Sequence, residues 1–141
     1  MKMKVLIVSA NYYLGYSSSL EADAEMLLDE AKIKFNIIHV PGAFEIPVTI
    51  AKNIKKYDGF IALGCIIKGE TPHFDFISKT TFDGLMKLSI ENKKPIGNGI
   101  ITALNSSQAT MRSGGDEIRI NKNKSKGREA AKAVISVLSQ K

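Results

Sequence analysis

The sequence is poor in the residues that build redox and metal sites, with one cysteine, Cys65, and two histidines among 141 residues. A single cysteine cannot form an intramolecular disulfide, and Cys65 has no second cysteine with which to bind a metal. This usage agrees with a reducing compartment, and we expect a cytoplasmic protein. The sequence also lacks a Walker loop, a G-x-G-x-x-G segment and clustered metal ligands, so it carries none of the common nucleotide and metal signatures.

Long apolar runs are absent as well. The apolar part of residues 1–8 is too short for a secretory signal, and Asn11-Tyr12-Tyr13 ends it without a small-residue cleavage pattern. No run reaches the ~20 apolar residues that a membrane-spanning helix needs. We therefore expect a soluble protein that neither carries a signal peptide nor binds a membrane.

Arginine is scarce for a basic protein of net charge +6 and isoelectric point about 9.4. Only Arg112, Arg119 and Arg128 supplement the lysines, which are scattered along the chain and form no arginine-rich face with aromatic residues. A nucleic-acid binder would show steeply salt-dependent affinity for DNA, but this pattern favours a solvated lysine surface and no nucleic-acid partner. The positive balance still suits a small phosphorylated or otherwise anionic ligand.

Four continuous apolar runs, each followed by a stretch with helical spacing, dominate the rest of the sequence. Continuous rather than alternating runs indicate strands buried on both faces, as in a parallel sheet covered by helices. We therefore predict one domain over residues 1–141, a three-layer α/β/α arrangement around a four-stranded parallel sheet. The predicted strands are Val5–Ala10, Phe35–Val40, Phe60–Ile67 and Pro95–Thr102.

The predicted helices follow these strands. Ser18 and Glu21 have the spacing of a capping box at the start of the first helix. Further helices are expected at residues 45–55, after the third strand, from the cap Asn105 through Arg112, and at residues 126–139, with 113–125 as a polar connection. On the last helix, five residues are expected to face the core: Ala130, Ala133, Val134, Val137 and Leu138.

The loops that leave the strands contain most of the candidate functional residues. Right-handed crossovers place all these loops at one edge of the sheet, where open α/β folds bind ligands. After the third strand, His73 can act as a general acid and base, or be a hydrogen-bonded loop residue. Gly69, Glu70 and Thr71 can present N–H groups and a hydroxyl to an anion, or form an ordinary turn. Lys68 is interpreted as a surface lysine.

The other candidates also keep two interpretations each. Tyr12 can stack on a planar ring or pack over the sheet edge. Glu45 can accept hydrogen bonds from ligand hydroxyls or be favoured only by the helix dipole, and Arg112 can bind a phosphate bidentately or extend into solvent. Asn98, polar within an apolar strand, is either a buried hydrogen-bonded residue or a ligand contact, and His39 is interpreted as structural. The residues alone predict an α/β domain that binds a small, planar or phosphorylated molecule.

Four segments together resemble the lumazine synthase family, the enzymes of the penultimate step of riboflavin biosynthesis. The resemblance extends over nearly the whole chain, and the shared order and spacing make it specific. It implies a flavodoxin-like fold. The segments are Pro41–Pro47 (PGAFEIP), Gly64–Asp75 (GCIIKGETPHFD), Pro95–Thr102 (PIGNGIIT) and Lys126–Ala131 (KGREAA).

The resemblance implies a reaction and the residues that serve it. The family condenses 5-amino-6-(D-ribitylamino)uracil with 3,4-dihydroxy-2-butanone 4-phosphate to 6,7-dimethyl-8-ribityllumazine, releasing phosphate and water, without a metal or organic cofactor. His73 matches the proton-transfer residue. The positions that match phosphate-binding residues are Gly69, Glu70, Thr71 and Arg112. Those that match residues binding the ribitylaminouracil are Tyr12, Ala43, Phe44, Glu45, Cys65, Ile66, Ile67, Asn98 and Lys126.

The resemblance also implies an assembly, because family sites form between neighbouring subunits of a pentamer. The chain departs from the family pattern in three places. Asn98 replaces a phenylalanine that stacks on the ring, an N-terminal arm before the first strand is missing, and the connection from Arg112 to Lys126 is long. We therefore expect a homopentamer or decamer rather than a sixty-subunit shell. A non-catalytic homologue that binds a flavin or a lumazine is the alternative.

Overall fold

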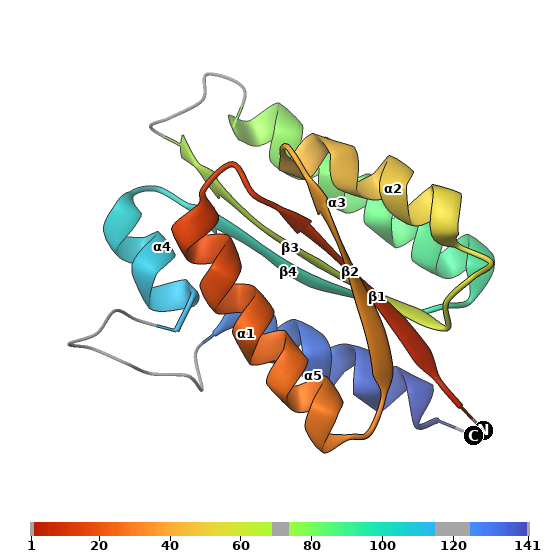
Figure 1. Ribbon diagram of the computed structural model, residues 1–141. Helices are drawn as coiled ribbons and strands as arrows, with labels where there is room; N and C mark the ends of the chain where they lie inside the picture. Colours follow the sequence, from red (N-terminus) through yellow and green to blue (C-terminus); the bar gives the residue numbers. More distant parts are fainter. Residues whose placement is uncertain (1, 69–73, 115–124, 141) are drawn as a thin grey trace.

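The computed structural model describes residues 2–68, 74–114 and 125–140, and Figure 1 shows the arrangement of its elements. The strands are β1 (Lys4–Ala10), β2 (Lys34–Val40), β3 (Gly59–Ile67) and β4 (Ile96–Ala103). The helices are α1 (Leu14–Glu30), the 3-10 turn η1 (Ala43–Glu45), α2 (Ile46–Asn53), α3 (Phe74–Asn92), α4 (Ser106–Arg112) and α5 (Lys126–Leu138).

The four strands form one parallel sheet in the order β2-β1-β3-β4. All nine residues of β3 are buried, as a strand covered on both faces requires. α1 and α5 cover one face of the sheet, while α2 and α3 cover the other (Figure 1). This confirms the predicted three-layer α/β/α arrangement, and the strand order is that of a flavodoxin-like fold.

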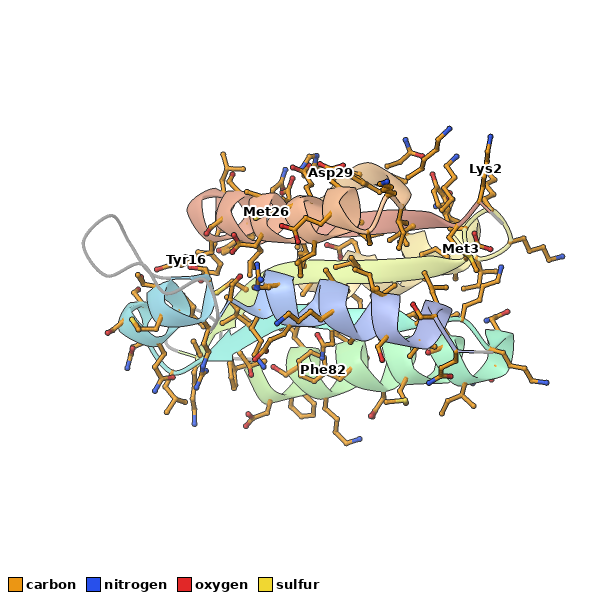
Figure 2. All side chains as sticks on the ribbon, turned by 90° about the horizontal axis from the view of Figure 1, so that it is seen from below. Lys2, Met3, Tyr16, Met26, Asp29 and Phe82 are labelled. Carbon is orange, nitrogen blue, oxygen red and sulfur yellow. The ribbon has the colours of Figure 1, made fainter. Side chains whose placement is uncertain are left out.

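Alternate residues of β1 supply the two cores of the protein. Val5 and Ile7 pack with residues of α1 and α5, whereas Leu6 and Val8 pack with residues of α2 and α3. Figure 2 looks onto the face of the sheet that α1 and α5 cover, and it labels Met26 on α1 and Phe82 on α3. Because successive side chains of a strand point to opposite faces, one central strand packs against both helical layers.

The predicted capping box at Ser18 and Glu21 is wrong. α1 begins earlier, at Leu14, and its N-cap Tyr13 makes no side-chain capping hydrogen bond. Ser18 is exposed within the helix, while the buried Ser17 donates from Oγ to the carbonyl of Ala10 and so fixes the first turn to the end of β1. The side chain of Glu21 contacts the sheet instead of the helix N-terminus.

The orientation predicted for the last helix is wrong at two of five positions. Ala133 and Val137 are exposed, whereas Gly127, Ala130, Ala131 and Val134 are buried. Gly127 sets this rotation, because a Cβ atom there would lie 2.3 Å from the carbonyl oxygen of Leu20. The close approach of α5 to α1 turns positions 133 and 137 away from the core.

The remaining boundaries agree closely with the sequence. Asn105 caps α4 as predicted, since its Oδ1 accepts a 2.9 Å hydrogen bond from the backbone N–H of Gln108. The helix predicted at residues 45–55 is the shorter α2, which follows η1 directly, ends at Asn53 and has Pro47 in its first turn. None of the helices in the described part of the chain is long and apolar enough to cross a membrane.

Candidate active site

A pocket of about 300 Å³ opens where the loops after β1, β2 and β3 meet. This is the edge of the sheet at which the strand order reverses, between β1 and β3, and where parallel sheets bind ligands. We call it the ring pocket. Its lining residues are Tyr12, Tyr13, Gly42, Ala43, Phe44, Cys65, Ile66, Ile67 and Ile77.

Two exposed aromatic residues mark the ring pocket. Tyr12 is 72% exposed and Phe44 is 61% exposed, so neither is used to fill the core. The loop that carries Tyr12 is tied at its start, because the N–H of Asn11 donates to the carbonyl of Val40 over 3.0 Å. Exposed rings beside an apolar floor can take up a planar ring by stacking.

The floor of the ring pocket is the end of β3. Cys65, Ile66 and Ile67 are all buried, and burial raises the pKa of the Cys65 thiol to about 12. The thiol is therefore neutral at physiological pH and behaves as a small apolar group, because the thiolate is the nucleophilic form.

Glu45 lies beside the ring pocket rather than in its lining. Its carboxylate folds back toward the Pro-Gly turn, where a Cβ atom at Gly42 would lie 3.3 Å from Oε1. Glu45 lines a neighbouring apolar groove between α2 and α3, and Phe44 lines both hollows. The groove that Glu45 lines therefore adjoins the ring pocket at Phe44.

A second pocket, of about 540 Å³, lies along the edge strand β4. We call it the edge pocket. Of the predicted site residues, Asn98, Arg112 and Lys126 come together here. Its lining residues are Phe74, Phe82, Asn98, Ile100, Thr102, Leu104, Gln108, Arg112 and Lys126.

Arg112 is held by the backbone rather than by an acid. Its Nη1 donates to the carbonyl of Thr102 near the end of β4, and within residues 2–68, 74–114 and 125–140 it forms no ion pair. As far as the described residues are concerned, most of its five N–H donors therefore remain for a ligand. Lys126, at the first residue of α5, lies 3.3 Å from the carboxylate of Glu129 and is 41% exposed.

Asn98 is exposed, so the interpretation as a buried hydrogen-bonded residue is wrong, while the ligand contact stays a prediction. Its Oδ1 accepts a 3.0 Å hydrogen bond from the backbone N–H of Ile100. Because Asn98 lies on the edge strand and lines the pocket, its NH2 group is available to a ligand. The ligand-contact interpretation therefore remains.

The ring pocket and the edge pocket have no lining residue in common. One chain thus divides the predicted site into an aromatic, apolar half and a polar, cationic half. The predicted residues Gly69, Glu70, Thr71 and His73 lie outside the described residues. Lys68, the last described residue before them, is exposed, as expected for a surface lysine.

His39 belongs to a separate network away from both pockets. Its Nε2 lies 3.0 Å from Oε1 of Glu21, and Oε2 of Glu21 accepts a 2.8 Å hydrogen bond from the buried Ser9. Glu21 therefore fastens α1 to β1 and β2, in agreement with a structural role for His39. Among the described residues, no three His, Cys, Asp or Glu side chains are grouped so that they could hold a metal ion.

The sequence predictions missed several residues of the two pockets. Tyr13 and Ile77 line the ring pocket, while Phe82 and Gln108 line the edge pocket. Gln108 could have been found, because it lies four residues before Arg112 and so on the same face of a helix. Phe82 and Ile77 carry no such signal, because an apolar residue on an amphipathic helix is ordinarily assigned to the core.

Comparison with known proteins assigns this chain to a family. The sequence model of the family described as 6,7-dimethyl-8-ribityllumazine synthase matches residues 2–141. The chain belongs to this family. Its members are transferases of riboflavin biosynthesis.

Individual relatives agree along almost the entire chain. The 6,7-dimethyl-8-ribityllumazine synthase of Bartonella henselae is 43% identical, over 99% of this chain and 89% of its own length. The protein of the same name from Agrobacterium fabrum is 40% identical, over 99% and 95% respectively. The one from Novosphingobium aromaticivorans is 40% identical, over 96% and 94%. The match therefore spans both the ring pocket and the edge pocket.

Proposed function

We propose that this chain condenses 5-amino-6-(D-ribitylamino)uracil with 3,4-dihydroxy-2-butanone 4-phosphate to 6,7-dimethyl-8-ribityllumazine, releasing phosphate. The observation that carries this proposal is the division of the described site residues into two chemically different pockets. One pocket suits a planar ring, and the other suits an oxyanion. Family membership makes this pair of substrates the one to test first.

The ring pocket would bind the ribitylaminouracil. Tyr12 and Phe44 would hold the pyrimidine ring, and the Cys65–Ile67 backbone at the end of β3 would contact its edge. Ala43 would line the turn beneath it. Glu45 lies one residue beyond Phe44, at the end of η1, and its carboxylate would accept hydrogen bonds from the ribityl hydroxyls.

The edge pocket would bind the phosphorylated substrate and the far side of the ring. Arg112 would hold the phosphate through charge-assisted hydrogen bonds, together with the segment Gly69–Thr71. Lys126 would add positive charge at the pocket mouth. Asn98 would donate to a ring carbonyl where the family pattern has a stacking phenylalanine.

The reaction needs proton transfers and the joint positioning of two substrates. One amine condenses with the ketone and releases water, phosphate leaves by elimination, and a second condensation of amine and carbonyl releases another water and closes the ring. His73 would act as general acid and base in these steps, which is worth ~10²–10⁴ in rate. Positioning supplies the rest, so the proposal invokes no cofactor.

The proposed enzyme works as an assembly. Because the ring and edge pockets share no residue, we propose that the ring pocket of one chain completes the edge pocket of its neighbour in a pentamer or decamer. An exposed apolar face that a neighbouring chain could cover lies on α3, where Phe76, Met86 and Ile90 are all strongly exposed. We also propose a cytoplasmic location and no nucleic-acid partner.

Mixing two variants with strongly reduced activity tests the shared site. A chain with His73→Ala keeps its edge pocket, and one with Arg112→Ala keeps its ring pocket. If neighbours share sites, unfolding and refolding the two together should restore about a quarter of the sites. No gain in activity over the separate variants after mixing, or a fully active monomer by light scattering, would contradict the shared site.

The proposed reaction is tested by mixing the purified protein with both substrates and following lumazine fluorescence. His73→Ala should slow product formation about tenfold or more. His39→Ala is the matched control, because His39 contacts Glu21 and neither pocket. Equal rates in wild type and His73→Ala would remove His73 from the chemistry while the activity stands.

The alternative is a non-catalytic homologue that binds a flavin or a lumazine, and Asn98 is the observation that favours it. An exposed amide in place of an aromatic ring gives up stacking on the substrate. If the protein forms no product but binds riboflavin tightly, this alternative holds. Product formation at a steady rate excludes it.

A further inference from the structure

The edge pocket contains two carboxamide side chains whose oxygen atoms are already engaged by the backbone. Oδ1 of Asn98 accepts from the N–H of Ile100 over 3.0 Å. Oε1 of Gln108 accepts from the N–H of Leu104 over 2.8 Å. Among the described residues, no hydrogen bond uses the NH2 group of either side chain.

The backbone partners decide how both amides are oriented. An N–H group can only donate, so the amide atom that faces it must be the oxygen. The two NH2 groups are then directed away from these anchors. Together with Arg112 and Lys126, they make the polar side chains of the edge pocket predominantly donors, a composition that selects ligands rich in acceptor oxygens.

Gln108 and Arg112 are anchored at neighbouring points of the chain. Arg112 donates to the carbonyl of Thr102, and Gln108 accepts from the N–H of Leu104, two residues further on. Both side chains lie on one face of α4, four residues apart. Asn98 lies four residues earlier in β4, about 13 Å from Thr102 at ~3.3 Å per residue.

We propose that the NH2 group of Gln108 is a hydrogen-bond donor to the phosphoryl group of the phosphorylated substrate, beside Arg112. This inference rests on the proposed function. Arg112 supplies the charge, and Gln108 supplies a neutral donor that binds a second phosphoryl oxygen. The bond from Leu104 holds the amide in place before the substrate arrives, so little side-chain freedom is lost on binding.

Gln108→Glu tests the donor without removing the anchor. The glutamate keeps an oxygen for the N–H of Leu104, but it replaces the NH2 group with an anionic oxygen. Asn105→Asp is the matched control. It makes the same change of charge in the adjacent loop, preserves the cap on Gln108, and lies outside the edge pocket.

Titration calorimetry with inorganic phosphate measures the change in phosphate affinity directly. Steady-state kinetics show which of the two substrates is affected. For Gln108→Glu, we expect phosphate affinity to fall about tenfold or more. The KM for the phosphorylated substrate should rise in parallel, while the KM for the ribitylaminouracil changes less than about twofold. Asn105→Asp should resemble the wild type. An unchanged phosphate affinity in Gln108→Glu, or an equal loss in Asn105→Asp, overturns the inference.

A second variant and a pH series guard against a purely structural effect. Gln108→Met removes the donor without adding charge, but it also removes the acceptor for the N–H of Leu104. We therefore expect phosphate binding about threefold to tenfold weaker, with a small drop in Tm. For Gln108→Glu, the deficit relative to wild type should shrink as pH falls toward 5, because a protonated carboxyl regains a donor. A Gln108→Met protein that binds phosphate like wild type overturns the inference.

The phosphate measurement also separates this inference from the proposed function. If wild type binds phosphate but forms no lumazine, the proposed function fails, and Gln108→Glu still shows whether Gln108 binds the anion. If wild type does not bind phosphate at all, the assignment of Gln108 fails, even where product is formed.

Discussion

The ring pocket and the edge pocket are built on different principles. The ring pocket lies above the buried centre of the sheet, and its floor is the end of β3, whose side chains pack into the cores on both faces. The edge pocket lies on a strand with only one neighbour, and its side chains are oriented by hydrogen bonds to the backbone of β4 and the following loop. Packing shapes the first pocket, and directed polar contacts shape the second.

This difference predicts how each pocket tolerates substitution. Apolar packing is distributed over many contacts, so single changes in the ring pocket should be graded in effect. Directed polar contacts are few, so single changes in the edge pocket should be sharp and specific to one substrate.

The largest effect is expected for Arg112→Ala. Loss of a charge-assisted contact of roughly 1.5–3 kcal/mol should lower kcat/KM for the phosphorylated substrate by about 10–150-fold. The KM for the ribitylaminouracil should change little. Lys132→Ala is the control, because Lys132 is exposed on α5 outside both pockets. A parallel loss with both substrates would show that the two pockets are not independent.

Gly97→Ala should break the packing that supports the edge pocket. A Cβ atom at position 97 would lie 2.3 Å from the carbonyl oxygen of Ala130, so α5 must move away from β4. Overpacking of this kind costs about 1–3 kcal/mol of the free energy of unfolding. At Gly15, a Cβ atom meets nothing within 4 Å, and alanine in this helix should stabilise by about 0.5–1 kcal/mol. Urea unfolding of both variants measures this difference in the free energy of unfolding. Equal unfolding midpoints for the Gly97 and Gly15 variants would contradict the prediction.

Tyr12→Ala and Phe44→Ala should each give a smaller, graded loss. Removing one ring from a stack costs about 0.5–1.5 kcal/mol beyond the lost area. The Kd for the ribitylaminouracil should therefore rise by about twofold to tenfold, while phosphate affinity stays constant. Met26→Ala, which removes an exposed apolar side chain of α1 outside both pockets, is the control. A change in phosphate affinity would argue against the assignment of the ring.

The smallest effect is expected for Cys65 at neutral pH. Cys65→Ala should leave turnover within about twofold, since a thiol with a pKa of about 12 is neutral and serves only as packing. Burial raises the thiol pKa in the folded state above its unfolded value near 9. Below pH 9 the thiol is neutral in both states, so the contribution of the buried thiol to the free energy of unfolding is fully present there. That contribution is lost as pH rises from about 9 toward 12. Urea unfolding from pH 7 to 10.5 should therefore show a steeper decline for wild type than for Cys65→Ala, and parallel curves would refute this.

Much of the fold could be predicted from local pattern. The four apolar runs became the four parallel strands, and Asn105 caps α4, because continuous burial and side-chain capping leave direct traces in the sequence. Ser18 and Glu21 had the spacing of a capping box, yet α1 begins at Leu14 and Glu21 bonds to Ser9 and His39. At this position, contacts of Glu21 with the sheet replaced the local capping interaction that the motif predicts.

The candidate site could be predicted as a set of residues but not as an arrangement. The sequence placed Tyr12, Phe44 and Arg112 among the candidates, and only the resemblance to the family implied that the strand-end loops and the arginine serve different sides of a shared site. Nothing in the spacing of these residues separates them into two pockets. That separation arises because β4 is the last strand of the sheet. Its outer edge pairs with no other strand of the described sheet, and the edge pocket lies along it.

By itself, the sequence determined the elements of this protein, the sheet-edge location of its loops and the family to which it belongs. These depend on hydrophobic period, capping and motif order, which are properties of neighbouring residues. Only the tertiary structure decided the exposure of Asn98, the rotation of α5 against Leu20 and the orientation of the Gln108 amide. Each depends on a contact between residues or segments whose geometry appears only when β4, α4 and α5 are packed in place.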